Sequence, residues 1–166
     1  MQSEKAFFDG VIIGVAIAAA CAFAILLLAT RNVLISIYAI VTVIFIVMSV
    51  VAIMVLQGWQ LGVSESIAMV IIIGFSVDYV VHLAAHYVHA AQPNRYERAH
   101  DSISAMGVSI FSGAITTLGS GVFLFGGTIV FFQKFALIIT STVIFSVSFA
   151  LIYFLAFLHA FGPERK

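Results

Sequence analysis

Residues 63–86 read VSESIAMVIIIGFSVDYVVHLAAH, an apolar run interrupted by only a few polar side chains. A bilayer core of about 30 Å is crossed by roughly 20 helical residues, so the run is long enough to span it. Asp78 lies about four residues past the middle of the run, or roughly 6 Å along the helix axis. The run therefore predicts a transmembrane helix that carries an acidic group at a depth where charges are costly.

Further apolar runs lie on either side of this one, at residues 10–29, 33–56, 103–125 and 135–157. Backbone in contact with lipid must satisfy its own hydrogen bonds, which favours helices. The strands of a membrane β-barrel would alternate apolar and polar residues, and these runs do not. We therefore expect an all-α membrane protein, a bundle of five transmembrane helices that forms a single domain over residues 1–166.

The composition excludes several classes of function. Of the 166 residues, 63% are apolar and 8% are charged, whereas soluble domains are about 45–50% apolar and about 25% charged. Seven basic residues balance seven acidic ones, so no basic surface is expected for nucleic acid. A single cysteine excludes a disulfide framework. Because no nucleophile–base set or cofactor-binding loop is recognisable, we expect neither an enzyme nor a bound cofactor or metal.

The basic residues predict an orientation in the membrane. An odd number of spans places the two ends of the chain on opposite sides, and five of the seven basic residues then share one side: Arg31, Arg95, Arg98, Arg165 and Lys166. By the positive-inside rule that side is cytoplasmic, so the C-terminus is expected inside and the N-terminus outside or in a lumen. An outside N-terminus without a targeting segment leads us to expect a fragment of a longer multi-pass protein.

Asp78 and His82 are the residues in the first run that point to chemistry. Acidic groups inside a membrane helix face a bundle interior or a wet cavity and commonly serve ion or proton pathways, a structural contact being the alternative. His82 follows Asp78 by four residues, so both lie on one helical face. The two side chains could share a proton, or His82 could hydrogen-bond across helices instead.

Other polar residues nearby have simpler interpretations. His86 and His89 continue the same face toward water, and a metal site is disfavoured because no acidic or sulfur ligand completes it. Ser64 is expected to cap the helix, with Glu65 complementing the helix dipole. The polar stretch 94–102 predicts either a short surface helix, with its arginines at lipid phosphates, or a solvated connector.

The run at 103–125 carries hydroxyl groups along one helical face. The spacing of three, four and four residues aligns Ser109, Ser112, Thr116 and Ser120. A neighbouring stripe of small residues, Gly113, Thr117 and Gly121, permits close helix packing. The hydroxyl face could meet Asp78 across the bundle and help to hold an ion or water, or it could serve packing alone.

The order of these features resembles a known group of membrane proteins. GWQLGVSES (58–66) leads into GFSVDYVVH (74–82), and MGVSI (106–110), SGAITT (112–117), FF (131–132) and FGP (161–163) follow. This order is similar to the C-terminal transmembrane block of the Patched/Dispatched group within the resistance–nodulation–division (RND) superfamily. Those permeases have twelve spans in two related halves, and the five spans of this chain resemble the last five. The resemblance implies that a further helix, outer domains and the other half of the permease precede them.

The resemblance also implies a function and a set of site residues. Such permeases couple sodium or proton flow to the transport or release of sterols, other lipids or lipid-modified cargo, which would be the partners. Gly74 and Asp78 match the Gly-x-x-x-Asp motif that supplies acidic groups for this coupling. His82 would be the proton partner of Asp78, with Ser112, Thr116 and Thr117 around them. Tyr79 stands where several Dispatched members have a second acidic residue, which leaves a single-carboxylate or Asp–His arrangement.

Other interpretations remain open from the sequence. The equivalent block in the first half of these permeases is the sterol-sensing domain, so the chain could be a regulatory module that senses sterol without transporting it. It could also be an inactive truncated copy. A bacterial lipid exporter of the same superfamily is a neighbouring possibility, although the Asp-Tyr-x-x-His pattern favours the Patched-like branch.

Overall fold

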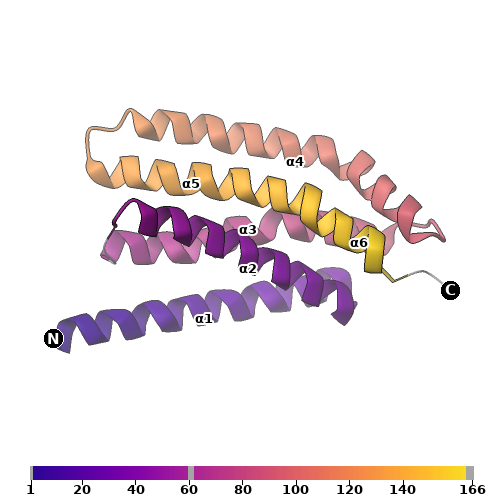
Figure 1. Ribbon diagram of the computed structural model, residues 1–166, viewed down its shortest axis with the longest axis horizontal. Helices are drawn as coiled ribbons and strands as arrows, with labels where there is room; N and C mark the ends of the chain where they lie inside the picture. Colours follow the sequence, from indigo (N-terminus) through magenta and orange to yellow (C-terminus); the bar gives the residue numbers. More distant parts are fainter. Residues whose placement is uncertain (1, 60–61, 164–166) are drawn as a thin grey trace.

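The computed structural model describes residues 2–59 and 62–163, and the regular structure over these residues is helical. The elements are α1 (Gln2–Thr30), α2 (Val33–Leu56), α3 (Val63–His89), α4 (Arg95–Phe125), α5 (Val130–Ser148), a π-helical stretch η1 (Phe149–Phe154) and α6 (Leu155–Phe161). The last three follow one another without a break and form one long helix (Figure 1). Within the described residues, five helices are long and apolar enough to cross a membrane. The expected all-α bundle is confirmed, and the chain is an integral multi-pass membrane protein.

Successive helices run antiparallel along the bundle (Figure 1). The α1–α2 turn, the α3–α4 loop and the end of α6 lie at one end, which we call the arginine end because it holds Arg31, Arg95 and Arg98. The α2–α3 and α4–α5 connections lie at the opposite end, which we call the lysine end after Lys134. The three described arginines are therefore grouped as the span count predicted, whereas residues 165 and 166 lie outside the described residues.

The helix α4 is longer than its apolar run. It begins at Arg95, directly after Asn94 in extended backbone, whereas the apolar run begins at residue 103. The first two turns are helical because Arg98, Ala99 and Ser102 are buried against neighbouring elements, at 5%, 3% and 1% exposure. The interpretation of this stretch as a solvated connector is therefore wrong, and the helical alternative is right.

Arg98 ties helix ends together at the arginine end. Its Nη2 atom donates to the carbonyl oxygens of Tyr87 at 2.7 Å and Val88 at 3.1 Å, and Nη1 donates to that of Pro163 at 2.8 Å. The guanidinium also lies over the Tyr87 ring, 4.5 Å from its centroid. Because the last carbonyls of a helix lack intrahelical donors, this arginine caps α3. The expectation that Arg98 reaches lipid phosphates is wrong, since buried carbonyls take its donors.

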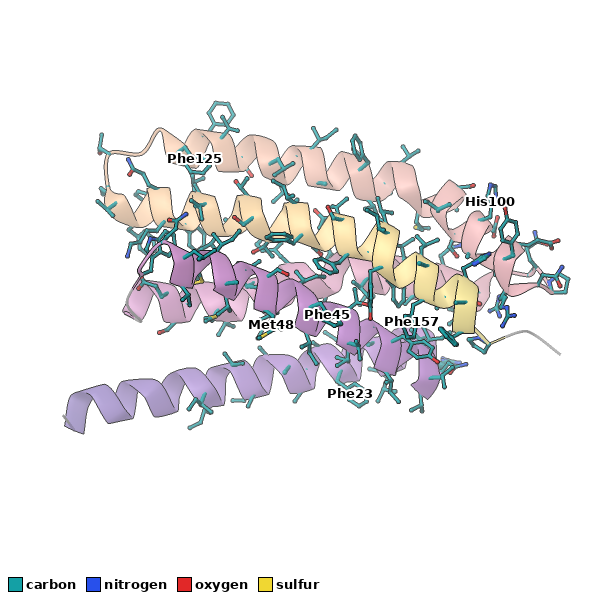
Figure 2. The ribbon with its side chains drawn as sticks, in the orientation of Figure 1. Phe23, Phe45, Met48, His100, Phe125 and Phe157 are labelled. Atoms are coloured by element: carbon teal, nitrogen blue, oxygen red, sulfur yellow. The ribbon has the colours of Figure 1, made fainter. Side chains whose placement is uncertain are left out.

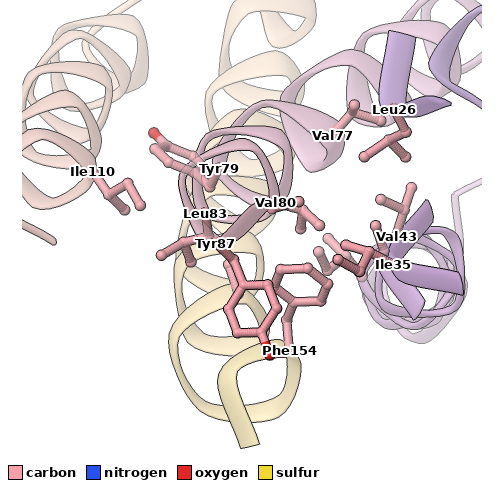
Figure 3. Packing of buried hydrophobic residues seen from close by; sticks show 14 of the residues in the cluster. Leu26, Ile35, Val43, Val77, Tyr79, Val80, Leu83, Tyr87, Ile110 and Phe154 are labelled. Carbon is pink, nitrogen blue, oxygen red and sulfur yellow. The ribbon is translucent and has the colours of Figure 1, made fainter. Parts of the chain in front are cut away.

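The helix α3 lies at the centre of the bundle and contacts α1, α2, α4 and α5. Half of its membrane-spanning window is buried, against 11% of the window of α1. Val77 packs toward Leu26 of α1, and Tyr79 packs toward Ile110 of α4 (Figure 3). These contacts fix the rotation of α3 and so decide which of its residues remain uncovered.

The outer surface of the bundle is apolar. Large hydrophobic side chains are exposed on α1, α2 and α4, among them Phe23, Met48 and Phe125 (Figure 2). An exposed apolar surface of this extent does not occur on a monomer in water. These faces are suited to contact with lipid tails or with other membrane helices.

A charged pair joins α3 to α5 at the lysine end. Nζ of Lys134 donates to Oε1 of Glu65 at 2.5 Å, and Glu65 is 4% exposed. The other carboxylate oxygen of Glu65 accepts the backbone N–H of Gly62 at 3.1 Å. The Lys134 ammonium also lies 5.1 Å from the centroid of the Trp59 ring. Because α3 begins directly after Gly62, that glycine holds the N-cap position, and the expectation that Ser64 caps the helix is wrong.

Candidate functional site

One face of α3 is left open by the other helices. Gly74, Asp78 and His82 follow one another at one-turn spacing on this face, and all three are exposed. The neighbouring helices pack on its two flanks, α1 through Val77 and α4 through Tyr79 (Figure 3). We call this surface the open face of α3. It brings the three predicted coupling residues together on the outside of the bundle.

Asp78 and His82 form a close pair on the open face. Nε2 of His82 lies 3.4 Å from Oδ1 of Asp78, and both side chains are 60% exposed. The pair has the geometry that the four-residue spacing predicts. Asp78 does not, however, face the interior of these five helices as expected, because the contacts with α1, α2, α4 and α5 occupy the other sides of α3.

A groove of about 300 Å³ lies between α1 and α3 beside Asp78. Its α1 wall is formed by Ala18, Cys21, Ala22 and Ile25, and its α3 wall by Val70, Ile73, Gly74, Val77, Asp78 and Val81. Asp78 is the one charged residue in this lining. Because surroundings of low polarity strengthen electrostatic attraction, the carboxylate is placed to hold a cation or a protonated imidazole firmly.

Gly74 lies one helical turn before Asp78, and the space beside its Cα atom is open. A Cβ atom added at this glycine would meet no atom within 4 Å, whereas one added at Gly121 would lie 2.8 Å from Oγ1 of Thr140. Packing among the described helices therefore requires the glycine at 121 and not the one at 74. A residue without a side chain beside Asp78 allows an ion, water or another helix to approach the carboxylate closely.

The hydroxyl groups predicted to surround Asp78 do not hydrogen-bond it within the described residues. Oγ1 of Thr116 donates to the carbonyl oxygen of Ser112 at 2.9 Å, and both residues are exposed. Oγ1 of Thr117 also donates to backbone within α4, at 3.0 Å. Thr117 also lies close to Tyr79 of α3.

The hydroxyl face of α4 nevertheless borders the open face of α3. Thr117 faces α3, whereas Gly121, one turn later, faces Thr140 of α5. Successive residues are about 100° apart around a helix. The side of α4 that is next to Thr117 and opposite the contact with α5 therefore carries small and hydroxyl residues. They are Ser109, Gly113, Thr116 and Ser120, and all are exposed. A polar strip of α4 therefore lies beside the open face without touching Asp78.

Tyr79 was noted in the sequence as a departure from the family pattern, but its role in packing between helices was not predicted. It is 5% exposed, it follows Asp78 directly, and it packs toward Ile110 of α4 and lies close to Thr117. The available signal was the small-residue stripe that contains Thr117, because such stripes mark where one membrane helix packs closely on another. A large residue with a hydroxyl group is suited to cross such an interface.

Comparison with known proteins identifies relatives, although no family model matches the chain. Protein dispatched homolog 1 of Mus musculus is 37% identical over 118 residues, which are 71% of this chain and 8% of that protein. Protein dispatched homolog 2 of Homo sapiens is 31% identical over 121 residues, which are 73% of this chain and 8% of that protein. Protein dispatched of Drosophila melanogaster is 46% identical over 57 residues, which are 34% of this chain and 5% of that protein. The chain thus corresponds to a small part of the length of these relatives.

The sequence identity to these relatives and the helical architecture support the same family assignment. The relatives match up to 73% of this chain, and the described residues form five apolar helices of membrane-spanning length. The resemblance to a Patched/Dispatched-related RND permease that the motifs indicated is thereby confirmed. This chain is a membrane protein and a homologue of the Dispatched proteins, which are Patched-related members of the RND family.

Proposed function

We propose that the chain is the ion-coupling part of a multi-pass transporter of the Patched/Dispatched type. It would couple sodium or proton flow to the transport or release of a sterol, another lipid or a lipid-modified cargo. The observation that carries the proposal is Asp78, an acidic side chain deep within a membrane-spanning helix. Such a placement costs about 3 kcal/mol on insertion scales, so it persists where the charge has a use.

Asp78 would be the group that binds the cation or exchanges the proton. His82 supports this role because its Nε2 atom lies 3.4 Å from the carboxylate. An imidazole nitrogen can donate or accept a proton, so the two groups are close enough to act as a pair. The absence of a side chain at Gly74 gives an ion access to the same carboxylate.

The hydroxyl residues of α4 would have a supporting role. Tyr79 of α3 packs toward Ile110 and lies close to Thr117 of α4, so a shift of α3 on ion binding would be passed to α4. Ser112 and Thr116 donate or accept within α4 and are exposed, so they can join a cation or a water chain without breaking a contact between helices.

The open face of α3 would be covered in the complete transporter. Asp78 and His82 are each 60% exposed, and a carboxylate turned toward lipid tails is unfavourable. We propose that helices from the remaining half of the permease lie against this face and enclose the pair. We also propose that the arginine end is cytoplasmic, because membrane proteins concentrate basic residues on that side.

A transport measurement tests the proposal. The native protein is reconstituted in liposomes that contain dehydroergosterol, a fluorescent sterol, and a sodium or pH gradient is imposed. Asp78→Asn keeps the shape of the side chain and removes its charge, so gradient-driven sterol release is expected to fall to background. Gradient-driven release that continues at the wild-type rate in Asp78→Asn would refute the coupling role.

A sensing function is the second candidate, and a specific groove favours it. The groove lies between α1 and α2, has a volume of about 280 Å³, and is lined by apolar side chains that include Val15, Phe23, Ile40 and Met48. Its size and polarity suit part of a sterol or an acyl chain. Photo-crosslinking with a sterol probe distinguishes the candidates, because saturable labelling that is independent of sodium and pH favours sensing over transport.

A further inference from the structure

Two hollows lie one after the other along α4. The first, of about 380 Å³, is at the arginine end, where Figure 2 shows His100, and it is lined by Gln92, Tyr96, Glu97, His100 and Asp101. The second, of about 530 Å³, is lined by Gly107, Val108, Phe111, Ser112, Ile115 and Thr116. We call them the polar hollow and the apolar hollow, after most of the side chains that line them.

Both hollows lie on the outer side of α4. Ala99 and Ile110 are buried, both at 3% exposure, so the opposite side of the helix faces away from the bundle. Because successive residues are about 100° apart, Asp101, Val108 and Ile115 lie on that outer side, within about 40° of one another. Val108 and Ile115 are 79% and 56% exposed. The two hollows therefore form one strip that runs parallel to the helix axis.

The polar hollow lies at the depth of lipid headgroups. The apolar run of α4 begins at residue 103, and Glu97 and Asp101 precede it by six and two residues, or about 9 and 3 Å along the helix axis. The headgroup layer of a bilayer is about 5 to 8 Å thick on each side. The apolar hollow begins at Gly107 and so lies within the hydrocarbon layer. One phospholipid molecule therefore has the right shape to occupy both.

The side chains of the polar hollow are suited to a cation. Its lining includes the carboxylates of Glu97 and Asp101 and no lysine or arginine. The ring of Tyr96 is held by the ring of His159 in a T-shaped contact, with 5.0 Å between the centroids. An ammonium group is attracted both to carboxylates and to the face of an aromatic ring. The polar hollow therefore favours a headgroup that carries a positive charge.

We propose that the outer side of α4 binds phosphatidylethanolamine, with its ammonium group in the polar hollow and an acyl chain in the apolar hollow. A primary ammonium has three N–H donors, which match the carboxylate oxygens of Glu97 and Asp101 and the amide oxygen of Gln92. Ser104 is exposed and lies on the same side of α4 between the hollows, so its hydroxyl is placed to donate to the phosphate. This site is separate from the open face of α3 and does not depend on the coupling role of Asp78.

The spacing along α4 matches the dimensions of this lipid. Asp101 and Ser104 are three residues apart, or about 4.5 Å along the axis, and only two carbons and one oxygen join the ammonium nitrogen to the phosphorus. Ser104 and Ile115 are eleven residues apart, or about 16 Å. Half of the hydrocarbon core is about 15 Å thick. The strip is therefore as long as the part of a lipid that occupies one leaflet.

Other phospholipids fit the strip less well. Phosphatidylcholine has the same positive charge, but its nitrogen carries methyl groups and no N–H donor for the carboxylates. Phosphatidylserine has a primary ammonium and also a carboxylate, which Glu97 and Asp101 would repel. The expected order of affinity is therefore phosphatidylethanolamine, then phosphatidylcholine, then phosphatidylserine.

Native mass spectrometry of the protein with bound lipid tests the proposal. The native protein in detergent is titrated separately with the three lipids, which carry the same acyl chains, and the fraction of protein with a bound lipid is measured. Phosphatidylethanolamine is expected to bind about tenfold more tightly than phosphatidylcholine, the difference that one hydrogen bond to a charged group supplies.

Two substitutions test the polar hollow. Glu97→Gln and Asp101→Asn keep the shape of the side chain and remove its charge, so each should weaken the binding of phosphatidylethanolamine about tenfold. The binding of phosphatidylcholine should stay at the wild-type level, which also shows that the variants are folded. Asp78→Asn is the matched control, because this carboxylate lies on the open face of α3, and it should bind phosphatidylethanolamine as the wild type does.

A third substitution tests the apolar hollow. A Cβ atom added at Gly107 would lie 3.7 Å from Cγ1 of Ile103, an ordinary contact, so folding tolerates a side chain there. Gly107→Leu fills the hollow and should weaken phosphatidylethanolamine and phosphatidylcholine alike, about tenfold. Gly113→Leu is the control, since Gly113 is another open glycine of α4 that lines neither hollow.

Three results would overturn the proposal. The first is equal affinity of the wild type for phosphatidylethanolamine and phosphatidylcholine, and the second is tighter binding of phosphatidylserine than of either. The third is wild-type affinity for phosphatidylethanolamine in Glu97→Gln, Asp101→Asn and Gly107→Leu, which would place the bound lipid elsewhere. None of these results bears on the coupling role, because that role is measured through Asp78.

Discussion

Nη1 of Arg98 lies 2.8 Å from the carbonyl oxygen of Pro163, although the two residues are 65 positions apart in the chain. The same guanidinium caps the last turn of α3 through the carbonyls of Tyr87 and Val88. Charge-assisted hydrogen bonds of this kind are stronger than neutral ones. At the arginine end, one buried side chain of α4 therefore joins the end of α3 to the segment after α6.

Replacing Arg98 is expected to destabilise the bundle. Arg98→Met keeps an unbranched chain but leaves the three carbonyls without their donor, so the free energy of unfolding should fall by about 3 kcal/mol. Arg98→Lys should recover only part of this loss, because one ammonium group cannot match the fork of the guanidinium. Unfolding of the protein in detergent by increasing denaturant measures the change. Arg31→Met, an exposed arginine at the same end, is the control and should have a small effect.

Gly162 is expected to tolerate no side chain. A Cβ atom at this position would overlap the Tyr87 hydroxyl and the carbonyl oxygen of Leu158. Gly162→Ala should therefore lower the unfolding free energy by about 2 kcal/mol, as overpacking does in a dense core. Gly113→Ala, at an open helical position, should leave it unchanged or raise it by about 1 kcal/mol. Equal stability of the two variants in the same denaturation assay would contradict the packing described for Gly162.

The pair formed by Glu65 and Lys134 is expected to show energetic coupling. Lys134→Met leaves a carboxylate that is 5% exposed without its cation, which should cost about 3 kcal/mol. Adding Glu65→Gln removes the unpaired carboxylate charge. The double variant should therefore have a higher free energy of unfolding than Lys134→Met alone. A double-mutant cycle with no coupling would show that the contact does not stabilise the bundle.

Gly74 is expected to matter for transport and not for folding. Gly74→Ala fills open space, so the unfolding free energy should stay constant or rise by about 1 kcal/mol. Sterol release should nevertheless fall, because the added methyl group narrows the approach to Asp78. Gly119→Ala, another open glycine, should leave both stability and release unchanged. If Gly74→Ala transports normally, close approach of an ion or helix at this position is not required.

The spans could be predicted from the sequence because each one depends on the length of a local apolar run. The contact between Asp78 and His82 could be predicted for the same reason, since residues four apart on a helix are always neighbours. The pairing of Glu65 with Lys134 could also have been predicted from the sequence. Counting spans puts both residues at the same end of the bundle, and they carry opposite charges.

Other features depend on contacts between distant parts of the chain. The first turns of α4 look like a polar loop, and they are helical because Arg98 finds carbonyls in α3 and at Pro163. The exposure of Asp78 is decided by the side on which each neighbour packs against α3, which a single helix does not reveal. For the same reason Thr116 lies beside the open face without meeting Asp78, and Ser112 lies on the exposed outer side of α4.

The measurement that tests the account most directly compares Asp78→Asn with Asp101→Asn in liposomes under an imposed sodium or pH gradient. Asp101 is a carboxylate of the same type, and it lies at the arginine end of α4 rather than on the open face of α3. The account predicts that Asp78→Asn loses gradient-driven release of dehydroergosterol and gradient-driven ion entry, while Asp101→Asn keeps both. Wild-type release and ion entry in Asp78→Asn would contradict it.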